Sequence, residues 1–167
     1  MEQNSEWGGR CLVDFPFVNE EPGLKYISRI LSELRKYKNV TMRSRMMGAG
    51  VYDHGYLLGY ERLNDHLSTN EGPRHRLWRI RAKQIITATG AIERPLSFPG
   101  NDIPGIMLAS AVRDYATNFG VAVGDKVAIF TNNDDAYRTA ITLHEIGVTV
   151  PVIIDARSGG GGELAHH

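Results

Sequence analysis

The sequence of 167 residues predicts an α/β fold, and three observations lead to that prediction. Apolar residues recur at spacings of three and four over residues 21–38, which is typical of an amphipathic helix. Three short strand-like segments follow over residues 49–83 and predict an antiparallel meander. Residues 126–154 then show the pattern strand, helix, strand, which predicts a parallel βαβ unit.

Composition narrows the class of protein. Hydrophobic residues make up 42% and charged residues 23% of the chain, and no apolar run approaches the ~18 residues that a membrane span requires. The 19 basic residues balance 19 acidic ones, so we expect neither nucleic acid nor a membrane surface as a partner. One cysteine, Cys11, excludes an internal disulfide framework, and the first residues show no signal peptide. We therefore expect a cytoplasmic location.

The first half of the chain supplies a helix followed by short strands. The helix over residues 21–38 begins with Pro22 in its first turn, and residues 40–46 alternate in a way that predicts a strand. Residues 49–53, 55–63 and 76–83 are the expected meander strands. The apolar residues 84–88 predict a buried parallel strand that stops at Thr89 and Gly90.

A basic alternation runs through the third meander segment. We interpret it as a solvated face, with Leu77 and Ile80 nearer the core; a surface for a partner subunit is the alternative. The basic residues are Arg74, Arg76, Arg79, Arg81 and Lys83.

The second half begins with an irregular crossing segment that Pro95, Pro99 and Pro104 interrupt. A helix over residues 108–118 follows, with Gly120 as its terminator. The βαβ unit then has strands at 126–131 and 148–154 and a helix at 134–146. We assign residues 1–108 to a first domain and 109–167 to a second. The glycine run 159–162 is either an artificial linker or a native loop before a helix near Glu163.

The strand end Ala88-Thr89-Gly90 is the first nucleotide signal. A strand ending in this way, followed by a proline-containing crossing and a fresh βαβ unit, is typical of flavoproteins with two dinucleotide folds. Gly90 lets the backbone approach a bound dinucleotide, which a Cβ atom would obstruct. A purely structural strand end is the alternative.

The turn of the βαβ unit lacks the phosphate-binding pattern. A G-x-G-x-x-G turn would bring backbone amides to the pyrophosphate, but residues 131–136 read TNNDDA. Asparagine side chains fill the space that phosphates need, and two aspartates at the positive end of the helix oppose an anion. We interpret this unit as structural, with Asp134 or Asp135 capping its helix.

The N-terminal segment holds a further candidate. In a Rossmann unit, an acidic residue about 20 residues after the glycine turn accepts hydrogen bonds from the adenosine ribose. Glu2, with Gln3 beside it and Gly8-Gly9 after it, is the candidate for this role. The glycine turn itself is then expected upstream of Met1, and a glutamate without a role is the alternative.

The sequence shows no catalytic or metal-binding constellation. The six histidines lack metal-ligand spacing, and no nucleophile elbow is present. Cys11 has no C-x-x-C partner and is expected to be a small core side chain. We therefore expect no catalytic residue and no metal site in this chain.

Residues 50–157 resemble the large (alpha) subunit of heterotetrameric sarcosine oxidases and the related opine and amino-acid oxidase subunits. Residues 2–45 are similar more loosely, as the second half of a first nucleotide domain. The Asn-Asn-Asp turn, where other relatives have glycines, is similar to that family's own signature. The matching stretches are VYDHGYLLGYERLNDHL, RIRAKQIITATGAIERPLSFPGNDIPGIMLASAV and FTNNDDAYRTA.

The resemblance implies part of a Rossmann-like two-dinucleotide fold, within a multisubunit flavoenzyme that oxidatively demethylates sarcosine. It implies NAD in the first nucleotide fold, and FAD and FMN in the assembled complex but not on this chain alone. The partners are then the other subunits of a heterotetramer, and the isolated chain is expected to be inactive.

The resemblance also implies roles for particular residues. Glu2 and Gln3 match the region that meets the adenosine ribose, and Gly48 matches a position whose backbone faces the adenine. Arg10 stands where the family has a small hydroxyl residue near the phosphates. A subunit of an opine or other secondary-amine oxidase or dehydrogenase is the first alternative. A nucleotide-free scaffold that docks other subunits is the second.

Overall fold

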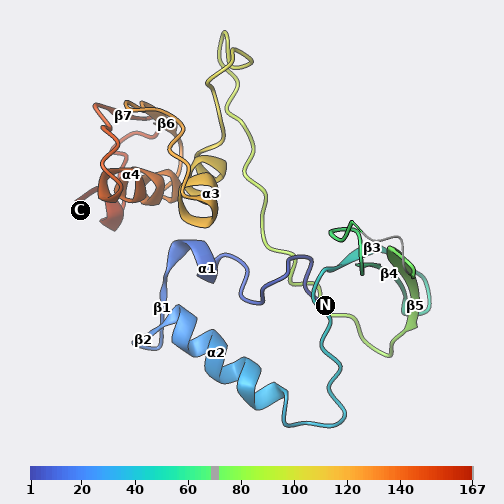
Figure 1. Ribbon diagram of the computed structural model, residues 1–167. Helices are drawn as coiled ribbons and strands as arrows, with labels where there is room; N and C mark the ends of the chain where they lie inside the picture. The colour runs from blue at the N-terminus through green and yellow to red at the C-terminus, as the bar shows by residue number, and fades with distance from the viewer. Residues whose placement is uncertain (69–71, 167) are drawn as a thin grey trace. The chain divides into compact units, whose positions relative to one another are not determined.

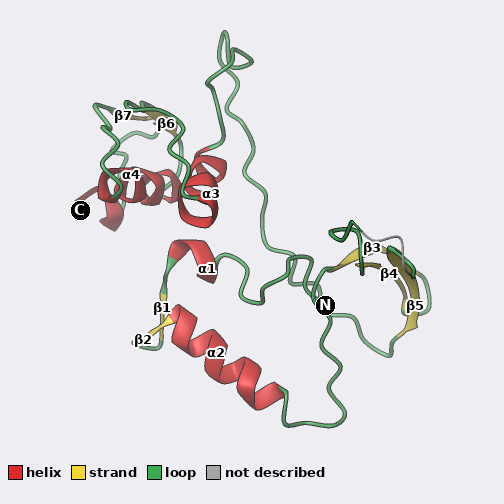
Figure 2. Cartoon of the chain, viewed as in Figure 1, coloured by secondary structure: helices red, strands yellow, loops and turns green. Residues whose placement is uncertain are grey.

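The computed structural model describes residues 1–68 and 72–166 (Figure 1). The chain divides into two compact units, Met1–Thr89 and Gly90–His167. Each unit contains both helices and strands (Figure 2), which confirms the predicted α/β class. The irregular segment after Gly90 lies in the second unit, and the domain division at residue 108 stays a prediction.

The first unit opens with two short elements before its main helix. Helix α1 (Cys11–Asp14) is followed by β1 (Phe17–Val18) and β2 (Glu21–Pro22), which pair antiparallel. Helix α2 (Gly23–Leu34) is the predicted amphipathic helix. It starts later than expected because residues 21 and 22 pair with β1, and it ends at Leu34 instead of residue 38. The Gly23 N–H donates to the Pro16 carbonyl oxygen at 2.6 Å, an approach that only glycine permits because a Cβ atom would lie 2.7 Å from that oxygen.

The predicted antiparallel meander is confirmed. Its strands are β3 (Met46–Tyr52), β4 (Tyr56–Arg62) and β5 (His75–Arg81), hydrogen-bonded in the order β3-β4-β5. The register shifts in β3 between Gly48 and Gly50, which marks a bulge.

The two faces of the meander differ in burial. Successive side chains of a strand point to opposite faces, so Arg76, Trp78 and Ile80 share the inner face with the buried residues of β4. Leu77 lies on the other face and is 60% exposed, so its expected place near the core is wrong. The basic alternation is therefore split between both faces, because Arg76 stands opposite Glu61 on the inner one.

Two strands predicted for the first unit are not formed. Residues 40–45 are irregular, and only Met46 of the predicted segment joins a strand. Residues 84–88 are also irregular, with Ile86 92% exposed. An apolar run becomes a buried strand only beside a neighbouring strand, and none in the described residues pairs with this one.

The second unit confirms the predicted order of elements. The crossing segment 90–108 is irregular, and α3 (Ala109–Phe119) ends at Gly120, whose φ of +63° closes the helix. Strands β6 (Ile129–Thr131) and β7 (Ile153–Asp155) pair parallel around α4 (Asp135–Glu145). A short 3-10 helix, η1 (Glu163–His166), stands where a helix near residue 163 was expected.

Both parallel strands are shorter than predicted. A bridge joins Lys126 to Thr149, but the regular ladder starts only at Ile129 and Ile153. The offset between partners grows by one residue across this interval, which contains Pro151. Proline has no N–H to donate, so the ladder is interrupted there.

The core of the second unit lies between its two main helices and one face of its strands. Val112 of α3, Leu143 of α4 and Val148 form a buried cluster, against which Val127 and Val150 pack. In the described part of the chain, no helix combines the length and the apolar character needed to cross a membrane.

The Leu143 side chain is 0% exposed, so Leu143→Ala should leave a cavity and lower the free energy of unfolding by about 2–5 kcal/mol. The matched control is Val121→Ala, at a position 47% exposed, which should change it by less than about 0.5 kcal/mol. Urea unfolding of both variants measures the difference. Equal losses would contradict this assignment of the core.

Candidate nucleotide-binding site

The structure brings two predicted site residues, Glu2 and Gln3, to one end of the meander. The Glu2 N–H donates to the Arg43 carbonyl at 2.9 Å, and the Met46 N–H donates to the Glu2 carbonyl at 2.8 Å. The Arg62 guanidinium donates to the Gln3 carbonyl at 2.9 Å. Glu2 and Gln3 therefore lie beside the start of β3 and the end of β4, and Gly48 lies two residues beyond Met46 in β3.

The Glu2 carboxylate is half-buried and keeps one oxygen unused by the described residues. Its Oε1 accepts a hydrogen bond from the Asn4 N–H at 2.9 Å, whereas Oε2 accepts none. Opposite Gly48 in the register stands Gly59, so this end of the β3–β4 pair carries two residues without side chains. Gly59 is buried, with the Met46 methyl 2.3 Å from the place that a Cβ atom would take, so only Gly48 of this pair is exposed. A free carboxylate oxygen such as that of Glu2 is chemically suited to ribose hydroxyls.

The other predicted residues lie elsewhere along the chain. Arg10 precedes α1, and its Nη2 pairs with Asp14 at 2.6 Å. Ala88, Thr89 and Gly90 are exposed, and Gly90 has a φ of +70° with no atom within 4 Å of the place that a Cβ atom would take. The open surroundings and the left-handed backbone of Gly90 fit a position that a ligand approaches closely.

A polar cluster that sequence reasoning missed holds the loop before β3 against the meander. The Glu61 carboxylate is 5% exposed and accepts a hydrogen bond from Trp78 Nε1 at 2.7 Å. Arg43 and Arg76 pair with it at 3.6 and 3.5 Å, and their guanidinium groups lie 5.2 and 5.4 Å from the Trp78 ring centre. The only signal for it in the sequence was an acidic residue at an inward-facing position of β4.

The Asn-Asn-Asp turn is built differently from the prediction. The Asn133 side-chain oxygen accepts the Asp135 N–H at 3.0 Å, and the Asp134 side chain makes no capping hydrogen bond. Asp134 holds the N-cap position of α4 but its side chain does not cap the helix, so the predicted capping hydrogen bond of Asp134 or Asp135 is wrong, and the Asn133 side chain supplies one instead. Both aspartate side chains form ion pairs with arginines instead of capping the helix: Asp135 pairs with Arg113 at 2.9 Å and Asp134 with Arg157 at 2.6 Å.

Asp155, at the carboxyl end of β7, stands where the ribose-binding acid of a Rossmann unit would be. Its carboxylate is occupied by Arg157 at 2.7 Å and by the Tyr137 hydroxyl at 3.0 Å. Hydrogen bonds from the Arg157 side chain and backbone hold the pKa of Asp155 well below its usual range. Asp155 thus stabilises the second unit through its contacts with Arg157 and Tyr137.

The glycine run is a folded loop against these carboxylates. The Gly161 N–H donates to Asp155 and the Gly162 N–H to Asp134, both at 3.2 Å. A Cβ atom at Gly162 would lie 2.1 Å from an Asp134 oxygen, so the Asp134 carboxylate would have to move to admit a side chain there. The choice between an artificial linker and a native loop for residues 159–162 stays open.

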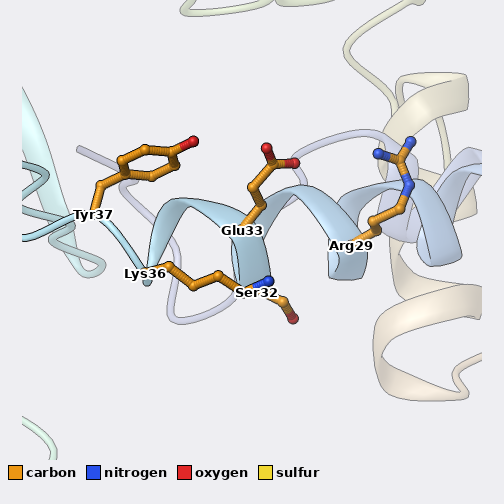
Figure 3. Close-up of a pocket in the computed structure, with 5 residues that line it drawn as sticks. All are labelled: Arg29, Ser32, Glu33, Lys36 and Tyr37. Carbon is orange, nitrogen blue, oxygen red and sulfur yellow. The ribbon is translucent and has the colours of Figure 1, made fainter.

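Two hollows lie outside these contacts. One, of about 510 Å³, lies in the second unit between the crossing segment and β6. The other lies at the end of α2, where Figure 3 shows Arg29, Ser32 and Glu33 on the helix and Lys36 and Tyr37 on the segment that follows it. Its charges of both signs and its place on a single helix give it no defined ligand. Among the described residues, no group of histidine, cysteine and acidic side chains is placed to hold a metal ion.

The predicted resemblance to alpha subunits of sarcosine oxidases is confirmed by comparison with known proteins. The chain is 39% identical over 163 residues to the alpha subunit of sarcosine oxidase from Rhizobium meliloti (strain 1021), covering 96% of this chain and 16% of that protein. It is 43% identical over 136 residues to the same subunit from Corynebacterium sp. (strain U-96), covering 80% and 14%. No protein-family model matches.

The chain thus spans about 14–16% of the length of these relatives. Among solved structures, L-proline dehydrogenase from P. horikoshii superimposes with a TM-score of 0.69 at 22% identity, over 97% of this chain and 31% of that one. This likeness shows that the fold is shared with part of that protein.

The lowered pKa of Asp155 predicts acid sensitivity of the second unit. An unfolded aspartate has a pKa of about 3.9, so the unfolded chain takes up the proton first, and stability present above about pH 4 is lost as the pH falls. Asp155→Asn should flatten this dependence, and Arg157→Gln should flatten it in part, because the N–H of residue 157 and the Tyr137 hydroxyl still donate to Asp155. Urea midpoints measured from about pH 2 to pH 6 test this. An unchanged slope in both variants would contradict it.

Proposed function

We propose that these residues are the NAD-binding portion of an alpha subunit in a sarcosine oxidase-like enzyme. The observation that carries the proposal is the 39–43% identity to three sarcosine oxidase alpha subunits over 80–96% of this chain. The complete enzyme would be a cytoplasmic multisubunit oxidoreductase that oxidatively demethylates sarcosine. FAD and FMN would belong to the assembled complex and not to this chain alone.

The proposed NAD site is in the first nucleotide fold. The unused Glu2 oxygen fits the ribose hydroxyls that NAD presents, and Gly48 offers exposed backbone without a side chain in β3. Gly90 supports the assignment through its left-handed backbone and open surroundings. The residues proposed to contact NAD are Glu2, Gln3, Arg10, Gly48, Ala88, Thr89 and Gly90.

The second unit is proposed to bind no dinucleotide. Its acidic strand end is paired with Arg157 and Tyr137, and its turn presents asparagine side chains in place of glycines. The Asp134 and Asp135 carboxylates already satisfy the cations at the start of α4. A phosphate bound there would have to compete with these carboxylates for Arg113 and Arg157.

Two alternatives lead to different observations. A subunit of an opine or other secondary-amine oxidase would also retain NAD but would support turnover of another amine. A nucleotide-free scaffold would retain none. Denaturing the purified complex and assaying the extract for NAD separates the scaffold from the enzymes, and the amine specificity of the complex separates the two enzymes.

Gly90→Ala should lower the NAD content of the assembled enzyme. The matched control is Gly120→Ala, because Gly120 also has a positive φ, +63° against +70°, and also has no atom within 4 Å of a Cβ position. Each substitution should cost about 1 kcal/mol of stability through its left-handed backbone. Only Gly90→Ala should reduce NAD per mole of complex, and equal NAD contents would refute a contact at Gly90.

The isolated chain should be catalytically silent, because the described residues hold no metal cluster and the sequence has no nucleophile elbow. Purified chain with sarcosine and an electron acceptor should give no turnover above buffer. The assembled complex is the positive control. Turnover by the chain alone would overturn the assignment of the chemistry to other subunits.

A further inference from the structure

Glu93, in the crossing segment, caps helix α3 from outside the helix. Its Oε2 accepts hydrogen bonds from the Ser110 N–H at 2.8 Å and from the Ser110 hydroxyl at 2.6 Å. Leu108, which holds the N-cap position, has no side-chain acceptor for the first N–H groups of the helix. A carboxylate at this end also interacts favourably with the helix dipole. Glu93 thus supplies the cap and closes residues 94–108 into a loop.

The helix end that Glu93 contacts is fixed in the second unit. Thr139 is 1% exposed, and its hydroxyl donates to the Ala109 carbonyl at 2.9 Å. The same hydroxyl accepts a hydrogen bond from Arg113, which also binds the Asp135 carboxylate. The start of α3 is therefore held against α4, and Glu93 attaches the loop to a fixed point.

The loop has few other attachments. In the part of the chain that the structure describes, the backbone hydrogen bonds of residues 94–107 are turns within the loop, such as that from the Ile103 N–H to the Gly100 carbonyl at 3.1 Å. A second contact with the rest of the unit is aromatic, because the Phe98 and Phe130 ring centres lie 5.5 Å apart. A segment that is held by few contacts opens at a lower free energy than the core around it.

The same loop forms one wall of the hollow of about 510 Å³. Leu96, Phe98 and Met107 line the hollow from the loop, and residues 126–131 line it from β6 and the segment before β6. The volume lies in the range of sites that hold small molecules in proteins. Movement of the loop would therefore change access to this hollow.

We propose that residues 94–108 are a lid over the hollow and that Glu93 is its latch. In the closed state, which the structure shows, Glu93 accepts both Ser110 hydrogen bonds and Phe98 contacts Phe130. In the open state both contacts are lost together, and the lid moves as one body. The inference concerns the second unit alone and does not depend on NAD binding.

Native-state amide exchange of residues 1–167 tests the latch. The Ser110 N–H should exchange through an opening that urea hardly affects, whereas the buried Leu143 should require unfolding of the whole unit. Glu93→Ala should speed Ser110 exchange by about tenfold or more, as expected for loss of a side-chain cap. The matched control Glu145→Ala, at an exposed position of α4, should leave it unchanged. A urea dependence at Ser110 equal to that at Leu143 would overturn the proposal, because the loop would then open only with the whole unit.

A second substitution distinguishes a lid from a simple helix cap. Phe98→Ala removes the contact with Phe130 and leaves Glu93 and Ser110 unaltered. Because a lid that moves as one body couples its two contacts, this change should speed Ser110 exchange several-fold. The control Phe119→Ala, which removes a ring 70% exposed at the end of α3, should not. Unchanged Ser110 exchange in Phe98→Ala would show that Glu93 only caps the helix, and the lid would be refuted.

Discussion

The ion pairs of Arg113 and Arg157 hold together the start of α4, and the second unit depends on them. Arg113 is 1% exposed and reaches from α3 to the carboxylate and carbonyl of Asp135. Arg157 reaches back from the end of β7 to Asp134. A guanidinium as buried as that of Arg113 is costly to desolvate unless it is paired, so these contacts are a condition of the fold.

The same pairs determine what the turn can bind. In a dinucleotide fold, the start of this helix and the end of the second strand receive the pyrophosphate and the ribose. Here the carboxylates of Asp134 and Asp155 occupy those places, bound by an arginine and by the amides of a glycine loop. The carboxylates of Asp134 and Asp155 thus lie where such a fold would place the phosphates and the ribose of a dinucleotide.

The first unit uses its charges in another way. The buried Glu61 gathers Arg43, Arg76 and Trp78, and so ties the loop before β3 to the meander. That tie keeps the carbonyl of Arg43 and the N–H of Met46 next to Glu2. The polar cluster therefore holds the segment around Glu2 in place, and one oxygen of the Glu2 carboxylate accepts no hydrogen bond from the described residues.

The local pattern of the sequence determined the elements whose cause is local. Periodicity identified α2, α3 and α4, alternation with turn residues identified the meander, and Gly120 marked a helix end because its backbone is left-handed. The predicted site residues stay a prediction: Glu2 and Gln3 lie together at one end of the meander, and the Glu61 cluster beside them could not be seen in the sequence. It joins residues from the loop before β3, from β4 and from β5, which only folding brings into contact.

Tertiary structure decided the rest, because the deciding contacts are distant in sequence. Residues 84–88 have the composition of a strand, yet a strand exists only beside a partner. Asn133, Asp134 and Asp135 are equally good caps by type, and the choice among them was made by Arg113 and Arg157, which are more than a turn of helix away in the chain. Each arginine pairs with one aspartate carboxylate, and the Asn133 side chain accepts the Asp135 N–H at the start of α4.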